Sequence, residues 1–497
     1  MKKTPWKTIL GFTAAYMAML VGLVRVESAA PEGVIHTLAD GFWFTLTTLT
    51  TVGYGDLYPV TAIGRLIGMV FQLLSLGLLA VLVGAAALMF KGTILPWVQL
   101  KLHRKDDWYI FTSHAPESDA LAAKLDAKEN GLVLFAEENS GLTLEQILAM
   151  RHDHQRTVIF CIGENEAENL RLSARLRDTG AKVCCQSSYE PEQLSANEII
   201  FDPASLCARL YWQKYPVTKK DETMILVGSG MYAEALLEYA LIQNVIDPEQ
   251  SIRYIVYGEF GNFRRNHPML KEICMSDRLE FHEEPWNQYL SDYEEADRII
   301  FCDAVKRINM DRVMQLLRYR PVHGRVYAMT AADLEGAVNF GTEEEIWSPE
   351  YVMRTELNRT AMYLHEIYCK QYGSTADWNH LGSFTRRSNL ASADHLPLKL
   401  SILLNDEAAD EPIENRYRLA YEKFTAAGPE ERDRYREIEH MRWMRFHLMN
   451  GWQYAPVRDN ARRRHPSLRP FSELTPEDQA KDDYGWELIG TLANRDR

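Results

Sequence analysis

The spacing of hydrophobic residues changes along the chain, and the N-terminal part has the pattern of a membrane segment. Residues 8–24 and 66–90 are apolar runs without a charged side chain. At about 1.5 Å per residue the first run reaches roughly 25 Å and the second is longer, so both predict membrane-spanning helices. Residues 37–50 are too few to cross a bilayer and predict a short re-entrant helix between the two spans.

From residue 108 onward, short apolar runs alternate with amphipathic stretches. Such alternation predicts strands that are each followed by a helix, and therefore two doubly wound parallel sheets. The stretches 156–170 and 297–310 look like the same element used twice, with Cys161 opposite Cys302. The predicted strands are 108–112, 131–138, 156–163 and 181–186 in the first sheet, and 222–230 (with its turn), 252–259, 297–304 and 324–330 in the second. From about residue 415 the pattern is mainly helical.

The segment between the two apolar runs contains the sequence Thr-Val-Gly-Tyr-Gly-Asp at residues 51–56. Thr51, Val52 and Tyr54 favour extended backbone, whereas Gly53 and Gly55 permit positive φ. Four such strands around one axis would form rings of carbonyl oxygens that replace the hydration shell of a potassium ion. A selectivity filter of this kind requires a membrane-spanning helix on each side, and the apolar runs 8–24 and 66–90 meet this requirement.

This arrangement resembles the two-helix bacterial potassium channels over about residues 1–95. The resemblance implies a homotetramer that conducts potassium, with Trp43 and Phe44 as an aromatic cuff around the filter. An alternative for these two residues is ordinary interfacial aromatics. By resemblance the selectivity filter is Thr51, Val52, Gly53, Tyr54, Gly55 and Asp56, with oxygens of the first four coordinating the ion and Asp56 at the outer mouth.

The distribution of lysine and arginine predicts the orientation in the membrane. The N-terminal residues Lys2, Lys3 and Lys7 and the basic cluster 101–105 lie on the same side after two spans. By the positive-inside rule both termini are cytoplasmic, and the channel resemblance implies a multi-pass protein of the bacterial inner membrane in contact with lipid. The alternative is a signal peptide cleaved after Ser28-Ala29-Ala30, which would remove the first span.

Two strand–helix units behind such a pore resemble tandem RCK domains of the TrkA-N type, the regulators of potassium conductance. In the second unit Gly228, Gly230 and Ala233 form a G-x-G-x-x-A turn after a strand, the pattern that receives a pyrophosphate. Glu259 ends the next predicted strand and is placed to bind ribose hydroxyls. We expect a nucleotide here, with a structural relic as the alternative. In the first unit residues 113–118 contain no glycine and one proline, so we expect no dinucleotide there.

The C-terminal region resembles the ryanodine-receptor repeat, or RyR domain, over about residues 415–495, on Gly451-Trp452-Gln453-Tyr454, Val457-Arg458-Asp459 and His465-Pro466-Ser467-Leu468. Residues 431–469 hold ten arginines and five acids within a chain of net charge −14. Guanidinium groups beside aromatic rings suit a small anionic or nucleotide ligand. The alternative is an aromatic core with arginines on a solvated face or against a neighbouring subunit. The expected sensor residues are Trp452, Tyr454, Arg458, Arg462, Arg463, Arg464 and His465.

Composition narrows the remaining function classes. The net charge of −14 and a pI near 5.6 argue against nucleic-acid binding. The seven cysteines include no C-x-x-C pair, and His440 and His447 lack a third ligand nearby, so neither disulfides nor a metal site are expected. No acid–base pair or nucleophile suggests a catalytic residue. A membrane-anchored NAD(P)-binding oxidoreductase and a non-conducting receptor on a channel scaffold are the alternatives to a channel.

These patterns together predict a membrane α-helical pore domain, followed by α/β Rossmann units and a small, mainly α module. The pore domain would consist of two spans and a re-entrant pore helix. The expected function is a ligand-gated potassium channel. The predicted parts are a pore domain at 1–100, RCK-like units at 105–218 and 220–350, a helical connector at 351–414 and the RyR module at 415–497.

Overall fold

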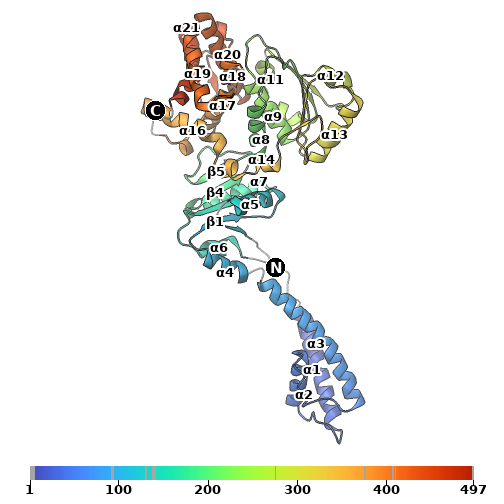
Figure 1. Cartoon of the computed structure of the whole chain (residues 1–497). Coiled ribbons are helices and arrows are strands. Elements are labelled where there is room, and N and C mark those ends of the chain that lie inside the picture. Colours follow the sequence, from blue (N-terminus) through green and yellow to red (C-terminus); the bar gives the residue numbers. More distant parts are fainter. Residues whose placement is uncertain are drawn as a thin grey trace. The chain divides into compact units, whose positions relative to one another are not determined.

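The computed structural model describes residues 6–90, 94–128, 131–136, 142–274, 276–373, 376–405, 408 and 410–494. The chain forms two compact units (Figure 1). The first comprises Met1–Arg104 with Glu137–Met150, and the second comprises Lys105–Ala136 with Arg151–Arg497. The predicted anchoring residues Lys2 and Lys3 lie outside the described residues.

The first unit contains five helices in its described part. α1 and α3 cover the two predicted spans, and α2 covers the predicted re-entrant helix. Across the described ranges, no helix combines the length and the apolar character needed to cross a membrane. The helices are α1 (Trp6–Ser28), α2 (Leu38–Leu49), α3 (Ala62–Met89), α4 (Leu95–Leu102) and α6 (Leu144–Ala149).

Helices α1, α2 and α3 are joined by specific polar contacts as well as by a small apolar core. Tyr16 of α1 hydrogen-bonds through its hydroxyl to Thr45 Oγ1 of α2 at 2.7 Å, and its ring packs edge-on against Phe71 of α3. Helix α2 begins with a capping box between Thr37 and Asp40. These contacts determine where the C-terminal end of α2, and hence the stretch after it, lies in the unit.

The first sheet of the second unit is parallel and has the order β2-β1-β3-β4-β5. Four of its strands were predicted, and the fifth was not. Its strands are β1 (Asp107–Phe111), β2 (Gly131–Phe135), β3 (Thr157–Cys161), β4 (Lys182–Gln186) and β5 (Glu198–Phe201). Its helices are α5 (Pro116–Lys128), α7 (Glu166–Leu176) and α8 (Pro203–Lys214).

The second sheet is also parallel, with the order β11-β10-β9-β6-β7-β8. Numbered within the sheet this is 3-2-1-4-5-6 read from its other edge, the strand order of dinucleotide-binding Rossmann domains. Four strands were predicted, whereas β8 and β11 at the edges were not. The strands are β6 (Thr223–Val227), β7 (Arg253–Tyr257), β8 (Arg278–His282), β9 (Arg298–Phe301), β10 (Arg325–Ala328) and β11 (Val338–Asn339).

Helices cover both faces of the second sheet, as a doubly wound fold requires. In Figure 1, α12 (Leu290–Glu295) and α13 (Lys306–Tyr319) lie on one side and α9 (Met231–Gln243) on the other. Alternate residues of β6 accordingly belong to different cores: Met224 and Leu226 pack with α9, whereas Ile225 and Val227 pack with α12 and α13. The short helices α10 (Gly261–Asn266) and α11 (Leu270–Ile273) lie between β7 and β8.

The predicted repeat between the two sheets also appears in side-chain contacts. Asn169 donates from its amide to the carbonyl of Gly163, which follows β3, and to the carbonyl of Gln186, the last residue of β4. Asn309 donates in the same way to the carbonyls of Asp303 and Met329, which follow β9 and β10. A buried asparagine thus joins the ends of two neighbouring strands in both sheets, which supports a common plan.

The rest of the second unit is helical. The helices α14 to α18 lead to α19 and α20, of which α20 is the longer at 21 residues. The elements are α14 (Glu343–Ile346), α15 (Pro349–Val352), α16 (Arg359–Tyr372), α17 (Ser383–Asp394), α18 (Leu396–Leu404), α19 (Ile413–Ala426), α20 (Pro429–Met449), β12 (Gln453–Tyr454), β13 (Arg464–His465), α21 (Pro476–Ala480) and α22 (Tyr484–Ala493). Phe424 and Trp486 stack in the core of α19, α20 and α22.

Candidate functional site

The Thr-Val-Gly-Tyr-Gly-Asp stretch forms the connection between α2 and α3. Gly53 and Gly55 have the expected positive φ, at +55° and +73°. The prediction of extended backbone at Thr51 is wrong, because Thr51 has a φ of +60°. A Cβ added at either glycine would meet no heavy atom within 4 Å. The backbone conformation, rather than crowding within one chain, is therefore what requires glycine at these two positions.

Trp43 braces this stretch from α2. Its indole Nε1 donates to Asp56 Oδ2 at 2.9 Å, and its ring stacks on Tyr54 with centroids 5.8 Å apart and planes 2° apart. Phe44, by contrast, is buried in the core between the helices, at 7% exposure. The two aromatics predicted as a cuff therefore differ: Trp43 contacts the stretch directly, whereas Phe44 supports the helix that carries it.

Glu27 at the end of α1 holds the residues between the 51–56 stretch and α3, and it was not among the predicted site residues. Its carboxylate accepts hydrogen bonds from the backbone N–H groups of Val60 and Thr61, at 2.8 and 3.0 Å, and from the Thr61 hydroxyl at 2.6 Å. Thr61 in turn caps α3 through Gly64. The sequence signal for this contact was a single acid just beyond the apolar run 8–24. If such a carboxylate is buried, it needs several hydrogen-bond donors close by.

The G-x-G-x-x-A turn lies at the carboxyl end of β6, beside the point where the strand order reverses between β6 and β9. Gly228 is packed so closely that an added Cβ would lie 2.7 Å from the Cys302 carbonyl carbon. Gly230 has φ +82° with open space around it and begins α9, while Ala233 is fully buried. The three small residues thus have the positions expected for a phosphate turn.

Glu259 lies two residues beyond the end of β7 and is exposed. Its backbone N–H donates to Ser229 Oγ at 3.1 Å, so the acidic residue is held next to the turn. Gly258 has a φ of +142°, and an added Cβ would lie 1.9 Å from the Gly228 carbonyl oxygen. The second sheet therefore brings Gly228, Gly230 and Glu259 together.

The corresponding turn of the first sheet is occupied by its own side chains. His114 stacks on Phe135, with centroids 3.9 Å apart, and its Nδ1 lies 3.1 Å from Asp119 Oδ1. Ser113 Oγ donates to the carbonyl of Ile162 across the sheet. Pro116 is the first residue of α5. The absence of a dinucleotide at this turn remains a prediction.

The predicted sensor arginines divide into two groups. Arg458, Arg462 and Arg464 line an open hollow of about 700 Å³ formed by residues 455–464. Arg463 instead has a φ of +50° and donates from its guanidinium to the Asn450 carbonyl at 2.8 Å. The hollow is held in shape by mutual backbone hydrogen bonds between Asp459 and Arg464. We call residues 455–464 the arginine loop.

The aromatic and histidine residues predicted beside these arginines have mixed surroundings. Trp452 is 6% exposed and packs against Phe384 and His447, whereas Tyr454 is 52% exposed. Burial lowers the pKa of His447 to about 3 and also lowers the pKa of His465. Both imidazoles are therefore neutral at pH 7, and the positive charge at the hollow comes from arginine alone. Trp452 is part of the core, so Tyr454 is the ring available for stacking.

Several arginines of α20 have internal partners. Arg434 pairs with Asp247, and Arg445 pairs with Asp277 at 2.9 Å and donates to the Leu241 carbonyl. These bonds attach α20 to the second sheet and its helices. These arginines of α20 therefore contact the second strand–helix unit of their own chain, and the arginine loop is a separate feature.

A buried ionic cluster lies between the connector and α20. Lys399 of α18 is fully buried, and its Nζ lies 2.7 Å from Glu439 Oε2 and donates to the Gly485 carbonyl at 2.6 Å. Arg442 pairs with the other oxygen of Glu439 at 2.5 Å. Burial opposes the charge of Glu439, but Arg442 and Lys399 outweigh that effect and hold its pKa well below the usual value. The i,i+3 spacing of Glu439 and Arg442 was the available sequence signal, whereas the contact with Lys399 had none.

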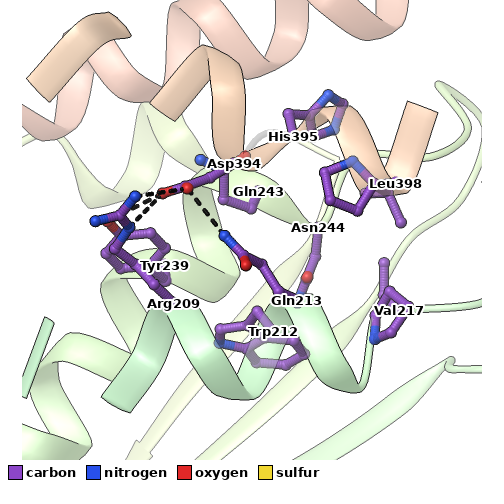
Figure 2. Close-up of a pocket in the computed structure, with 12 residues that line it drawn as sticks. Arg209, Trp212, Gln213, Val217, Tyr239, Gln243, Asn244, Asp394, His395 and Leu398 are labelled. Carbon is purple, nitrogen blue, oxygen red and sulfur yellow. Dashed lines mark hydrogen bonds and ion pairs between the residues drawn. The ribbon is translucent and has the colours of Figure 1, made fainter. Parts of the chain in front are cut away.

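A second buried pair joins the connector to the first strand–helix unit. Arg209 of α8 donates to both oxygens of Asp394 of α17, at 2.7 and 2.9 Å (Figure 2). Gln213 and Tyr239 also bond the Asp394 carboxylate, at 3.0 and 3.4 Å. The adjoining cavity has a volume of about 20 Å³, which is the size of one water molecule. It is therefore a packing feature and not a nucleotide site.

Comparison with known proteins identifies both ends of the chain. Residues 7–91 match the ion channel family, and residues 427–492 match the RyR domain family. A voltage-gated potassium channel of Aeropyrum pernix is 36% identical over 83 residues, which are 16% of this chain and 28% of that protein. The calcium-gated potassium channel TvoK of Thermoplasma volcanium is 27% identical over 165 residues, 32% of this chain and 44% of that protein. The chain is thus similar to potassium channels near its N-terminus and to RyR domains near its C-terminus.

Solved structures of the GsuK channel are also similar to this chain. One is 16% identical with a TM-score of 0.36 and covers 71% of this chain and 99% of that one. Another, described as bound to NAD, is 13% identical with a TM-score of 0.35 and covers 71% and 86%. The curated relatives above are matched over less than half of their own length.

Proposed function

We propose that this chain is one subunit of a tetrameric, ligand-gated potassium channel of the bacterial inner membrane, with both termini cytoplasmic. The observation that carries the proposal is the stretch 51–56, with its two positive-φ glycines and its brace from Trp43. Within one chain Val52 and Tyr54 are 53% and 66% exposed, although both are apolar. Contacts with three further copies around a common axis would cover them and create the rings of carbonyl oxygens that select potassium.

Gating in this proposal comes from the soluble part of the chain. To move a gate from 1:99 to 99:1, a ligand must favour one state by about 5.5 kcal/mol, or roughly 1.4 kcal/mol for each of four sites. Potassium flux from the reconstituted full chain, measured with and without a panel of nucleotides, tests the proposal. Flux that responds to a ligand supports it. Purified protein that binds a nucleotide but never conducts would favour the non-conducting receptor.

The second strand–helix unit is the proposed nucleotide site, with the phosphates at Gly228 and Gly230 and a ribose at Glu259. The open space around Gly230 and the first N–H groups of α9 support this placement, because helix N-termini attract phosphate. The tie between the Glu259 backbone and Ser229 keeps the acid near the turn. The boundaries 105–218 and 220–350 are proposed for the two RCK-like units.

Gly230→Val is expected to weaken adenine-nucleotide binding by about tenfold or more, since a side chain would occupy the space that a pyrophosphate needs, at a φ that valine disfavours. Isothermal titration of the full chain with ADP and NAD measures the effect. His114→Ala, in the turn after the first strand of the first sheet, is the matched control and should bind as the wild type does. Equal losses of binding in the two variants would contradict the assignment of the nucleotide site to the second sheet.

The arginine loop is the proposed sensor for a small anion of nucleotide type, with Tyr454 as the stacking partner. Its hollow of about 700 Å³ falls within the size range of small-molecule sites. Three arginines and one acid, Asp459, line the hollow, and Arg462 pairs with that acid. A local excess of positive charge in a chain of net charge −14 favours an anionic ligand.

Arg464→Ala is expected to reduce binding of ATP or inorganic triphosphate by about tenfold, the effect of losing one charge-assisted hydrogen bond. Arg463→Ala separates binding from folding, because Arg463 points its guanidinium to Asn450 rather than to the hollow. It should lower the stability of the turn while leaving the affinity of the folded protein nearly unchanged. Titration calorimetry combined with thermal unfolding distinguishes the two. An affinity loss confined to Arg463→Ala would be inconsistent with the hollow as the site.

A further inference from the structure

Helix α4 has an apolar surface that its own unit leaves uncovered. Ile94, Val98 and Leu102 follow one another at intervals of four residues and so form a single stripe along the helix, with Leu95 beside it. The exposed fractions are 44% for Ile94, 37% for Val98, 77% for Leu102 and 39% for Leu95. Leu100 on the opposite side is 1% exposed. The helix therefore has a buried side and an exposed apolar side, and the exposed one is the larger.

The edge of this stripe carries an aromatic ring and cations. Trp97 is 42% exposed, and the Lys101 ammonium lies over its ring, 3.9 Å from the centroid. Arg104 follows and is exposed, and residues 94–104 contain no acidic residue. An apolar stripe bordered by tryptophan, lysine and arginine is the pattern of helices that lie in a membrane interface, with the apolar side in the acyl chains and the cations among headgroups.

We propose that α4 is an interfacial helix that docks on an anionic lipid surface. The proposal rests on the membrane location in the proposed function, since α4 follows α3 in the chain. A protein partner would be expected to present acids to Lys101 and Arg104, but it would not require the tryptophan at the border of the stripe. An acidic bilayer surface supplies the negative charge and the apolar layer together. Docking would hold the segment between α3 and the first sheet at the membrane surface.

Lipid quenching of tryptophan fluorescence tests the docking. The full chain is reconstituted in vesicles of phosphatidylcholine, with or without phosphatidylglycerol, that contain lipids brominated near the headgroup end of the acyl chains. The wild type should show more quenching than Trp97→Phe, and the difference should increase with the fraction of phosphatidylglycerol. Trp286→Phe, which removes a half-buried tryptophan of the second sheet unit, is the matched control and should keep the anionic-lipid effect.

Charge removal gives a second, quantitative measurement. Each of Lys101→Gln and Arg104→Gln should lower the ratio of docked to free α4 by about fivefold in anionic vesicles, and neither should change quenching in phosphatidylcholine alone. Arg307→Gln, an exposed arginine on α13, is the control and should have no effect. These substitutions leave the apolar stripe and the fold of α4 intact.

Equal quenching of the wild type and Trp97→Phe at every lipid composition would overturn the inference. Shielding of Trp97 in detergent that increases with protein concentration would overturn it too, because a second copy of the chain would then cover the stripe. Potassium flux from the same vesicles reports separately on the proposed function. Flux without Trp97 quenching rejects the lipid surface alone, whereas Trp97 quenching without flux rejects the channel and leaves the lipid surface supported.

Discussion

Gly53→Asp is expected to abolish potassium selectivity while leaving the soluble part of the chain folded. The added Cβ meets nothing within its own chain, so the subunit can fold. In a tetramer, however, four new carboxylates would lie next to the axis, at a backbone position whose φ of +55° favours glycine. The permeability ratio of potassium to sodium should fall at least about tenfold, toward unity, a change of about 1.4 kcal/mol in relative barrier height. Bi-ionic reversal potentials of the reconstituted channel measure it.

Gly428→Asp is the matched control for this substitution. Gly428 precedes α20, has a φ of −69° and has open space around it, so an aspartate there can cap the helix. The control should conduct with unchanged selectivity. Wild-type protein that passes sodium as readily as potassium would disprove the potassium channel directly, and a selective Gly53→Asp channel would disprove the role of the 51–56 stretch.

Glu439→Gln is expected to destabilise the C-terminal helices by about 3–5 kcal/mol, the cost of leaving buried charges without their partner. Lys399 and Arg442 are 0% and 3% exposed and share this one carboxylate. Hydrogen exchange of the full chain should show lost protection in α18, α20 and α22, the helices around the cluster. Glu422→Gln removes an exposed i,i+4 partner of Arg418 in α19 and should cost less than about 1 kcal/mol.

The same substitution has a defined pH dependence. The pKa of Glu439 in the folded protein lies below its ordinary value, because the two cations outweigh the effect of burial. Its contribution to stability is therefore fully present above the unfolded-state pKa of about 4.3 and is lost as the pH falls below it. The stability difference between the wild type and Glu439→Gln should be constant from pH 6 to 8 and should shrink in acid. A difference that grows below pH 4 would show that the carboxylate is not held charged by this cluster.

The excess of arginine in residues 431–469 predicted a basic region, but composition alone did not show which of these arginines have partners within the chain. Composition alone suggested one basic surface with ten arginines. In the folded chain Arg434 and Arg445 pair with acids of the second sheet unit, and Arg442 belongs to the buried cluster. The hollow retains Arg458, Arg462 and Arg464. The acids that pair with Arg434 and Arg445 lie more than a hundred residues away in sequence, and such partners cannot be deduced from local charge.

Local sequence was sufficient to predict the positive-φ glycines and the central strands, because both depend on residues that are close together in the chain. The positive φ values at Gly53, Gly55 and Gly230 follow from glycine's lack of a Cβ, and the central strands follow from continuous apolar runs that are buried on both faces. The edge strands β5, β8 and β11 were missed although the edge strand β2 was predicted. β5 and β11 are only four and two residues long, and β8 alternates charged with apolar residues, so none of the three forms a long apolar run.

Only the tertiary structure decided which chemical groups meet. Glu27 reaches Val60 and Thr61 across more than thirty positions, and Lys399 reaches Glu439 across forty. Trp452 and Tyr454 are two positions apart in a short extended segment, yet one is buried in a ring cluster and the other exposed. The physical reason is that a buried charge or ring gains its stability from long-range partners, and only the assembled fold brings those partners within contact distance. Local pattern thus predicted the positive-φ glycines of the 51–56 stretch and of the G-x-G-x-x-A turn, but not the left-handed backbone of Thr51. Tertiary packing determined which side chains support these segments.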